Sequence, residues 1–300
     1  MQNKSSYLLS GLLSAIIWGF FAFPLRNLQN FSAEQILYFR VFMALTIVWL
    51  FIALFRKQKL LADFQYLVSV PKPQLRSLII QVIGSAVLLM LNWYSFIYAI
   101  NHISIKSAAF AYMVCPLITA FGAYLFLKEQ LSRVQFLALF FAAISILLLA
   151  RGAFVDVLWS AVIAAFYAFF LIIQRKMQGL DKLNVMAVQL ALASLIMLPL
   201  FLVSGVETPN SVFFWQNILL IASIFTVIPL FLNLYALVGI PSSTMGIIIY
   251  INPIIAFAVA FIYFDEQVNL YQVLAYSLLL FAVFLFNWQM IKDMLIFRRK

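Results

Sequence analysis

One stretch of this chain occurs twice, and the repeat limits the folds that the chain can adopt. Residues 92–148 align without a gap on residues 229–285, 137 positions later. The anchor pairs are Pro116 with Pro253, Glu129-Gln130 with Glu266-Gln267, and Gln135 with Gln272. Apolar matches are expected by chance in a chain that is 66% hydrophobic, but shared Pro, Glu-Gln and Gln at fixed spacing are not. The repeat therefore predicts an internal duplication.

Composition assigns the chain to the integral membrane proteins. Mean hydropathy is +1.09 and only 9% of the 300 residues are charged. A soluble domain needs more polar surface than this to cover its outside. The apolar runs are long enough to cross a bilayer as helices, which takes roughly 20 residues each. We expect ten such helices, at 7–28, 35–55, 75–100, 107–127, 134–150, 154–173, 184–203, 213–238, 243–264 and 270–291.

The ten helices form two sets of five, residues 1–150 and 151–300, in one membrane unit. Because five is odd, two repeats of five must have opposite orientations in the membrane. The segment 7–28 lacks a small-x-small cleavage site, so we expect a retained helix, with a signal peptide as the alternative. The connection 56–74 is the longest, and its apolar patch at 64–70 is too short to span.

The charges predict the orientation of this bundle. With the N-terminus inside, 15 of the 19 Lys and Arg residues fall on the cytoplasmic side, as the positive-inside rule requires. The fold class is thus an all-α integral membrane protein, ten helices as two inverted five-helix repeats. Both termini are expected to be cytoplasmic, in a multi-pass protein of the cell (inner) membrane.

Several function classes find no support in the sequence. There is no phosphate-binding G-x-x-x-x-G-K-[ST] run, no His-acid spacing for a metal, and a single histidine, His102. The nine acidic residues lie at helix ends or in loops, so no pair of catalytic groups lies at depth. Basic residues interleaved with aromatic ones, as in nucleic-acid platforms, are also missing. We therefore expect no enzyme activity, no metal or other cofactor and no nucleic-acid partner.

Two prolines lie near the middle of corresponding helices. Pro116 and Pro253 each leave the carbonyl four residues earlier, that of Tyr112 or Ile249, without its helical partner. In a membrane such a group needs another partner or a wet cavity. The duplicated prolines predict a central site between the repeats, with the two kinked helices as its gate. A simple packing kink is the alternative.

Polar and aromatic side chains at the same depth extend this candidate site. Segments 75–100 and 213–238 each carry a polar stripe at helical spacing, which either lines a cavity or links helices. The candidate pocket residues, for a small-molecule substrate, are Trp18, Asn92, Trp93, Tyr112, Tyr167, Thr226, Asn233, Tyr250 and Asn252.

Three charged residues have competing interpretations. Arg40 extends to the interface, pairs with Glu34, or contacts an anionic group of a substrate. Glu129 and Glu266 end corresponding helices. We expect them to cap or tie the next helix, with a gating role as the alternative.

The chain resembles the EamA permeases of the drug/metabolite transporter superfamily. The resemblance rests on the pattern Pro…Glu-Gln…Gln, which occurs at the ends of two predicted helices, one in each repeat. It covers nearly the whole chain. Trp18-Gly19, Glu34…Arg40, Asn92-Trp93…Phe96 and Tyr112…Pro116-Leu117 look most like the RarD branch. It implies a ten-helix bundle with cytoplasmic termini that moves amino acids or other metabolites, usually outward. It also implies a pocket from segments 7–28, 75–100, 107–127, 154–173, 213–238 and 243–264. Many relatives have Gly before the acidic residue, where this chain has Lys128 and Asp265.

Together these observations predict a secondary transporter of small organic solutes that works by alternating access. Two alternatives from other classes are a lipid-handling protein, such as a flippase accessory, and a membrane scaffold that transports nothing. A polar lateral opening between helices would favour the first. Pocket residues that tolerate replacement by Leu would favour the second.

Overall fold

The computed structural model describes residues 4–102, 105–149, 154–263, 270–288 and 292, and every regular element among them is a helix. The first half contains α1 (Lys4–Gly19), α2 (Ala22–Asn27), α3 (Ala33–Phe51), the π-helical turn η1 (Ile52–Arg56), α4 (Lys57–Ser69), α5 (Lys72–His102), α6 (Ile105–Phe126) and α7 (Arg133–Leu149). The second contains α8 (Phe154–Lys176), α9 (Lys182–Ser204), α10 (Val212–Ala222), the π-helical turn η2 (Ser223–Val227), α11 (Ile228–Gly239), α12 (Ser242–Ile248), α13 (Ile251–Ile262) and α14 (Leu270–Phe286).

Each of the ten predicted segments coincides with one helix or with a short series of helices. Among the described residues six helical stretches are long and apolar enough to cross a membrane. They are Ser5–Asn27, Ala33–Ser69, Lys72–Phe96, Leu158–Lys176, Lys182–Ser204 and Val212–Gly239. Four further apolar stretches of 10–17 residues are Ala111–Phe126, Arg133–Leu148, Ser242–Ile255 and Val273–Phe286. The protein is therefore a helical membrane protein, and a count of ten spans stays a prediction.

Four of the predicted helices contain a break or a π-helical turn. The second ends in η1, directly after α3. The first breaks between α1 and α2 at 20–21, and the eighth contains η2 between α10 and α11. The ninth divides into α12 and α13 at 249–250, just before Pro253 at the third position of α13. There its missing N–H costs little, because the first-turn N–H groups have no helical partner. Pro116 lies inside an uninterrupted α6.

The connection after the second helix, for which the sequence analysis predicted no regular structure of its own, contains the helix α4. Leu60, Leu61, Phe64, Leu67 and Val68 follow each other at spacings of one, three and four residues, which gives α4 an apolar side. A short helix with one apolar side suits the surface of a bilayer.

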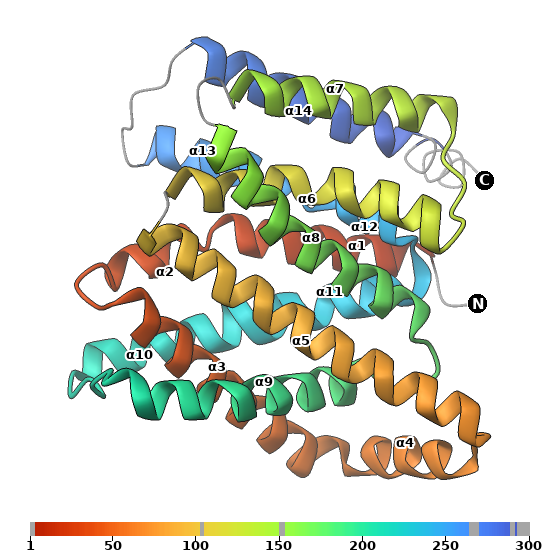
Figure 1. The fold of residues 1–300 in the computed structure, drawn as a ribbon, viewed down its shortest axis with the longest axis vertical. Coiled ribbons are helices and arrows are strands. Elements are labelled where there is room, and N and C mark those ends of the chain that lie inside the picture. Colours follow the sequence, from red (N-terminus) through yellow and green to blue (C-terminus); the bar gives the residue numbers. More distant parts are fainter. Residues whose placement is uncertain (1–3, 103–104, 150–153, 264–269, 289–291, 293–300) are drawn as a thin grey trace.

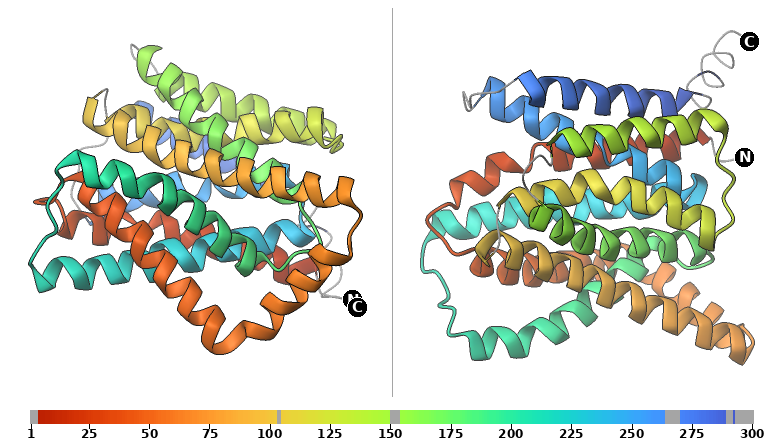
Figure 2. Two further views of the ribbon diagram at one scale, coloured as in Figure 1. Left: turned by 60° about the horizontal axis from the view of Figure 1, so that its bottom comes forward. Right: turned by 45° about the horizontal axis from the view of Figure 1, so that its top comes forward.

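The helices pack in a repeating pattern (Figures 1 and 2). One edge of the bundle is the pair α7 and α14, and the opposite edge contains α3, α9, α10 and α4. Between them, α1 packs on α11 and α13, while α8 packs on α5 and α6. α1 and α8 run in opposite directions, as Figure 1 shows. Both central helices carry the small residues that close packing needs, such as Ala15 and Ala164.

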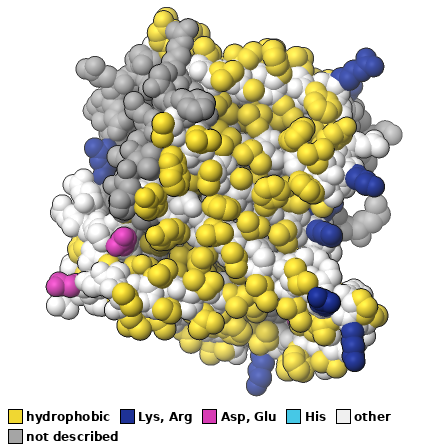
Figure 3. Space-filling view, viewed as in Figure 1, with side chains coloured by type: hydrophobic (Ala, Val, Ile, Leu, Met, Phe, Trp, Pro, Cys, Tyr) yellow, Lys and Arg dark blue, Asp and Glu magenta, His cyan; other side chains and the backbone are white. Residues whose placement is uncertain are grey.

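The surface has the polarity of a protein embedded in lipid. Apolar side chains cover the face shown in Figure 3, while most of its Lys and Arg side chains gather along one end of the bundle. Many large apolar residues are exposed, Leu54, Phe64 and Val203 among them. Exposed apolar surface of this extent is unfavourable in water and suits a hydrocarbon environment.

Candidate functional site

A central cavity of about 290 Å³ lies between the helices of the two halves. It is lined from the first half by Trp18, Phe21, Leu25, Arg40, Leu89, Asn92, Trp93, Phe96 and Tyr112. From the second half it is lined by Tyr167, Phe225, Thr226, Leu230, Ile249 and Asn252. Seven of the nine predicted pocket residues therefore lie in one wall, together with Arg40. The cavity is mostly aromatic and apolar with a few polar groups, which is typical of a small-molecule site.

Three of the four irregular places, all except η1, occur at this cavity. Phe21 lies in the break after α1, Phe225 and Thr226 belong to η2, and Ile249 lies between α12 and α13. In η2 the Ile228 N–H donates to the Ser223 carbonyl, five residues back. A π-helical turn shifts the pairing of the backbone, and such turns are frequent at functional sites. Irregular backbone at this depth is tolerated where it is buried in protein or lines a cavity.

Trp18 uses one of the carbonyls in this irregular backbone. Its indole Nε1 donates to the Phe225 carbonyl over 3.0 Å. One turn earlier on α1, the Ser14 hydroxyl donates to the Pro229 carbonyl over 2.8 Å. These two bonds fix α1 against η2 and α11. The Trp18 ring meets the Tyr167 ring edge-on, with 6.4 Å between the ring centroids.

Other polar groups of the wall differ in how well they are paired. Asn92 donates from Nδ2 to the Ile163 carbonyl over 2.9 Å, so it links α5 to α8 as well as facing the cavity. The Thr226 hydroxyl is buried and has no hydrogen-bond partner. Unpaired polar groups are costly in an apolar interior. Thr226 thus offers a donor and an acceptor to a molecule in the cavity.

Arg40 is the charged residue of the cavity. Its guanidinium carbon lies 5.3 Å from the Trp93 ring centroid and 5.9 Å from that of Phe21, within range of cation–π attraction. Pairing with Glu34, one of the three alternatives for Arg40, is not found. The ion pair among the described residues is that of Arg56 with Asp181, at 2.7 Å.

The remaining predicted residues lie behind the wall. Asn233 and Tyr250 are fully buried and do not line the cavity, which corrects their predicted place. Asn233 donates to the Tyr167 hydroxyl over 3.3 Å, so it supports a wall residue. Pro116 and Pro253 are buried too. The two carbonyls they affect belong to wall residues, Tyr112 and Ile249, and that of Ile249 accepts the Asn252 N–H over 3.0 Å.

Sequence reasoning missed several apolar wall residues, such as Phe21, Leu89 and Phe225. Their types carry no signal in a chain with 32 Phe residues. Helical spacing could have identified some of them. Leu89 lies three positions before Asn92, on the same face of the helix, and Phe225 lies next to Thr226.

Glu129 joins the two halves at one end of α6. Its carboxylate accepts from the backbone N–H and the hydroxyl of Ser242, both over 2.9 Å. It also accepts from the N–H of Ser243 over 3.1 Å and from the Ser243 hydroxyl over 2.5 Å. It therefore caps α12 of the other half, whereas the sequence suggested the next helix along the chain. Glu266 lies outside the described residues.

Lys128 stands in the turn before Glu129, at a position where the family resemblance implies Gly. Lys128 has φ of +54°, in the left-handed region that favours Gly. The Glu129 N–H donates to the Ala123 carbonyl over 3.2 Å, which closes the end of α6. The helix-end geometry is thus formed without Gly. The repeated Gln135 also has a structural role, since it forms a capping box with Ser132 at the start of α7.

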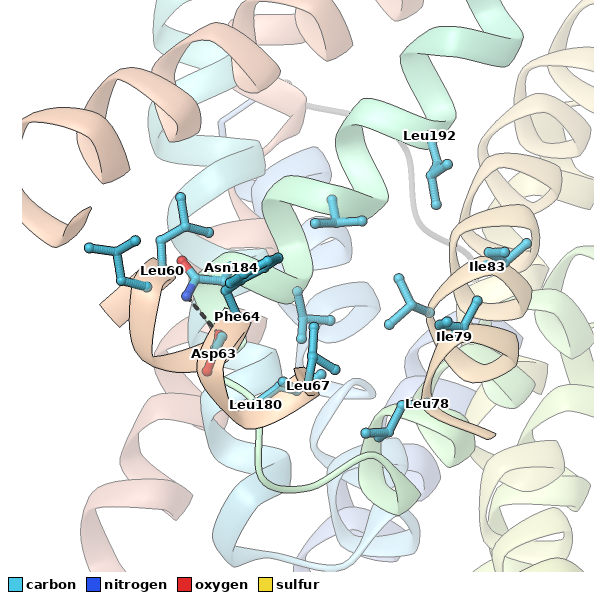
Figure 4. A pocket seen from close by; sticks show the side chains of 14 residues that line it. Leu60, Asp63, Phe64, Leu67, Leu78, Ile79, Ile83, Leu180, Asn184 and Leu192 are labelled. Carbon is cyan, nitrogen blue, oxygen red and sulfur yellow. Dashed lines mark hydrogen bonds between the residues drawn. The ribbon is translucent and has the colours of Figure 1, made fainter. Parts of the chain in front are cut away.

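A second hollow of about 590 Å³ lies between α4, α5 and α9 (Figure 4). Its wall consists almost entirely of Leu, Ile, Val and Phe side chains. The polar members are Asp63 and Asn184, and the Asn184 amide donates to the Asp63 carboxylate over 2.7 Å. Asp63 also accepts from the Asp181 N–H. The Asn184 Oδ1 atom is buried and has no hydrogen-bond partner. Because the other twelve lining residues are all apolar, the groove suits hydrocarbon.

Comparison with known proteins connects this architecture to transport. The EamA-like transporter family matches residues 5–151 and 155–288. An uncharacterized transporter of Bacillus subtilis (strain 168), YojE, is 26% identical over 93% of each chain. Protein RarD of Escherichia coli (strain K12) is 25% identical over 95% of this chain and 94% of its own. A solved crystal structure covers 94% of this chain and 96% of its own with a TM-score of 0.71 and 13% identity, which shows the fold alone.

Proposed function

Because this chain belongs to the EamA-like transporter family, we propose that it is a secondary transporter of small organic solutes and that the central cavity is its solute site. The observation that carries this proposal is the position of the cavity. It lies where the first, eighth and ninth predicted segments are all interrupted, and both halves contribute to its wall. Transporters with repeated halves bind their substrates at such places, between discontinuous helices.

We infer ten spans in two inverted halves, residues 1–150 and 151–300. The packing supports this arrangement, since the contacts of α1 with α11 and α13 correspond to those of α8 with α5 and α6. The start of α1 and the end of α14 lie at the same end of the bundle in Figure 1, as an even number of spans requires. That end carries most of the basic residues seen in Figure 3. Cytoplasmic termini in a cell (inner) membrane follow from the positive-inside rule.

The proposed mechanism is alternating access, in which the halves rock around the cavity. Glu129 and α12 close one end of the interface between the halves in this conformation. Pro253, beside the break at 249–250, and Pro116, inside α6, are the proposed flexible points. Rocking of one repeat against the other would then open the cavity to each side in turn.

The groove between α4, α5 and α9 is the observation that bears on the lipid-handling alternative. A protein that moves lipids needs a polar opening for the head group. The polar residues in this groove, Asp63 and Asn184, bind each other. We therefore assign the groove to contact with the bilayer and keep transport of small solutes as the proposal.

The test is ligand-dependent stabilisation of the purified protein in detergent. A panel of amino acids, aromatic metabolites and lipids is added, and the melting temperature is measured, since a ligand of the folded state raises it. Thr226→Val removes a hydroxyl that faces the cavity, and Thr46→Val makes the same change on the exposed side of α3.

The proposal predicts stabilisation by one class of small solute, weakened in Thr226→Val and unchanged in Thr46→Val. Stabilisation by lipids alone, equal in both variants, would contradict it and support the lipid-handling alternative.

A further inference from the structure

Arg40 places a positive charge well inside the membrane-embedded bundle. It lies seven residues after the start of α3, which is roughly 10 Å along the helix. Its side chain is partly buried and lines the central cavity. A charged side chain at such depth is costly, and in membrane proteins it usually marks a functional site.

No protein group among the described residues compensates this charge. The ion pair in this part of the chain is that of Arg56 and Asp181, and Arg40 Nε is buried without a hydrogen-bond partner. The rings of Trp93 and Phe21 lie near the guanidinium, and Tyr112 is close enough to interact with it electrostatically. Aromatic faces attract a cation more weakly than a carboxylate does. The cavity wall therefore contains a cationic group that can bind an anionic part of a solute.

The rest of the wall defines the other features of a matching solute. None of the fifteen described residues of the wall is Asp or Glu, so a solute ammonium group would find no carboxylate among them. Trp18, Trp93 and Phe225 provide flat apolar surface, and Thr226 provides a free hydroxyl. The volume of about 290 Å³ is at the low end for ligand pockets, which suits a solute with a single ring.

We propose that the solute is a small organic monocarboxylate with a flat apolar body, and that Arg40 binds its carboxylate. This inference rests on the proposed function, because it names the substrate class of the same site. A guanidinium presents two parallel N–H donors that fit a carboxylate, and the bond is strong where water is excluded. The ring of the solute lies among the aromatic residues of the wall.

The experiment compares four probes that share one benzene ring and differ in charge. They are phenylacetate, its neutral amide, the zwitterion phenylalanine and the cation phenethylamine. Each is titrated against the purified full-length protein in detergent, and the apparent Kd is taken from the rise in melting temperature. The variants are Arg40→Gln and, as a control, Arg76→Gln at the exposed start of α5.

We expect phenylacetate to bind at least tenfold more tightly than its amide, and more tightly than the zwitterion or the cation. Arg40→Gln should remove this preference and leave binding of the amide within about threefold, whereas Arg76→Gln should change neither. Without ligand, Arg40→Gln should melt no lower than the wild type, because it removes a buried charge that lacks a partner.

Three results would overturn the proposal. They are equal binding of phenylacetate and the amide by the wild type, a carboxylate preference that survives Arg40→Gln, and a clear loss of stability in unliganded Arg40→Gln. If the amide or the cation binds best and Thr226→Val weakens it, the proposed transport site stands and only the carboxylate class fails. If no solute of either panel binds, both proposals fail.

Discussion

At the scale of single residues, Glu129 shows how one side chain can hold two repeats together. Its carboxylate receives four hydrogen bonds from Ser242 and Ser243 at the N-terminus of α12. A negative charge there also interacts favourably with the helix dipole. The residue is thus part of the framework around the cavity.

Replacement of Glu129 should therefore reduce stability. Glu129→Gln keeps the size of the side chain but removes the charge and an acceptor, so we expect a loss of about 1–3 kcal/mol in the free energy of unfolding. The measurement is denaturant unfolding in detergent. Glu207→Gln, in an exposed connection, is the control and should change stability by less than about 0.5 kcal/mol. Equal effects of the two changes would show that the cap contributes nothing.

At the scale of helices, close approach between the repeats depends on small residues. A Cβ atom added to Gly246 in α12 would lie 2.8 Å from the Thr119 Cβ atom in α6, closer than side-chain contacts allow. At Gly84 in α5 the nearest atom would be Ile173 Cδ1 at 4.0 Å. The two helical glycines thus differ in the space around them.

Alanine at these two positions should have opposite effects. Gly84→Ala should stabilise the protein by up to about 1 kcal/mol, because Ala has the higher helix propensity. Gly246→Ala should destabilise it by about 1–3 kcal/mol, because overpacking outweighs that gain. Unfolding in detergent measures both. Stabilisation of similar size in the two variants would mean that α12 and α6 do not pack as described.

The same scale shows what the sequence could predict. All ten apolar segments are helical, because in a bilayer a helix satisfies every backbone group of a single segment. The helix breaks were harder to predict from the sequence. Pro253 lies near one break, and Pro229, two residues after η2, lacks the N–H that would pair with the Phe225 carbonyl. Pro116, by contrast, lies in a continuous helix. A break depends on tertiary partners, such as the Trp18 indole that binds the Phe225 carbonyl.

The candidate site was predictable to a similar extent. Polar and aromatic residues at depth must face the protein interior, which is why Trp18, Asn92 and Tyr112 line one cavity. Helical spacing does not separate a wall residue from one packed behind it. Asn233 and Tyr250 were placed in the wall for this reason, although they lie in the layer behind it.

At the scale of the whole molecule, the structure is one conformation of two similar halves around a cavity. The contacts of α1 and α8 repeat across the interface, while Glu129 closes one end of it. If contacts like those of Glu129 broke at one end of the interface and similar contacts formed at the other end, the cavity would open to each side of the membrane in turn. The central claim is that the wall of this cavity is reached from both sides of the membrane.

The measurement that tests this claim is the labelling of a cysteine in the cavity wall. Cys115 is buried and is the only cysteine, so Cys115→Ala gives a background without thiols. Thr226→Cys is added to it, and sealed vesicles of either orientation are treated with a thiol reagent that cannot cross the membrane. Glu207→Cys, in the connection between α9 and α10, is the control for sidedness.

The account predicts that Thr226→Cys reacts from both sides and that a stabilising solute slows both reactions. Glu207→Cys should react from one side only. Reaction of Thr226→Cys from a single side, or from neither, would contradict alternating access around this cavity.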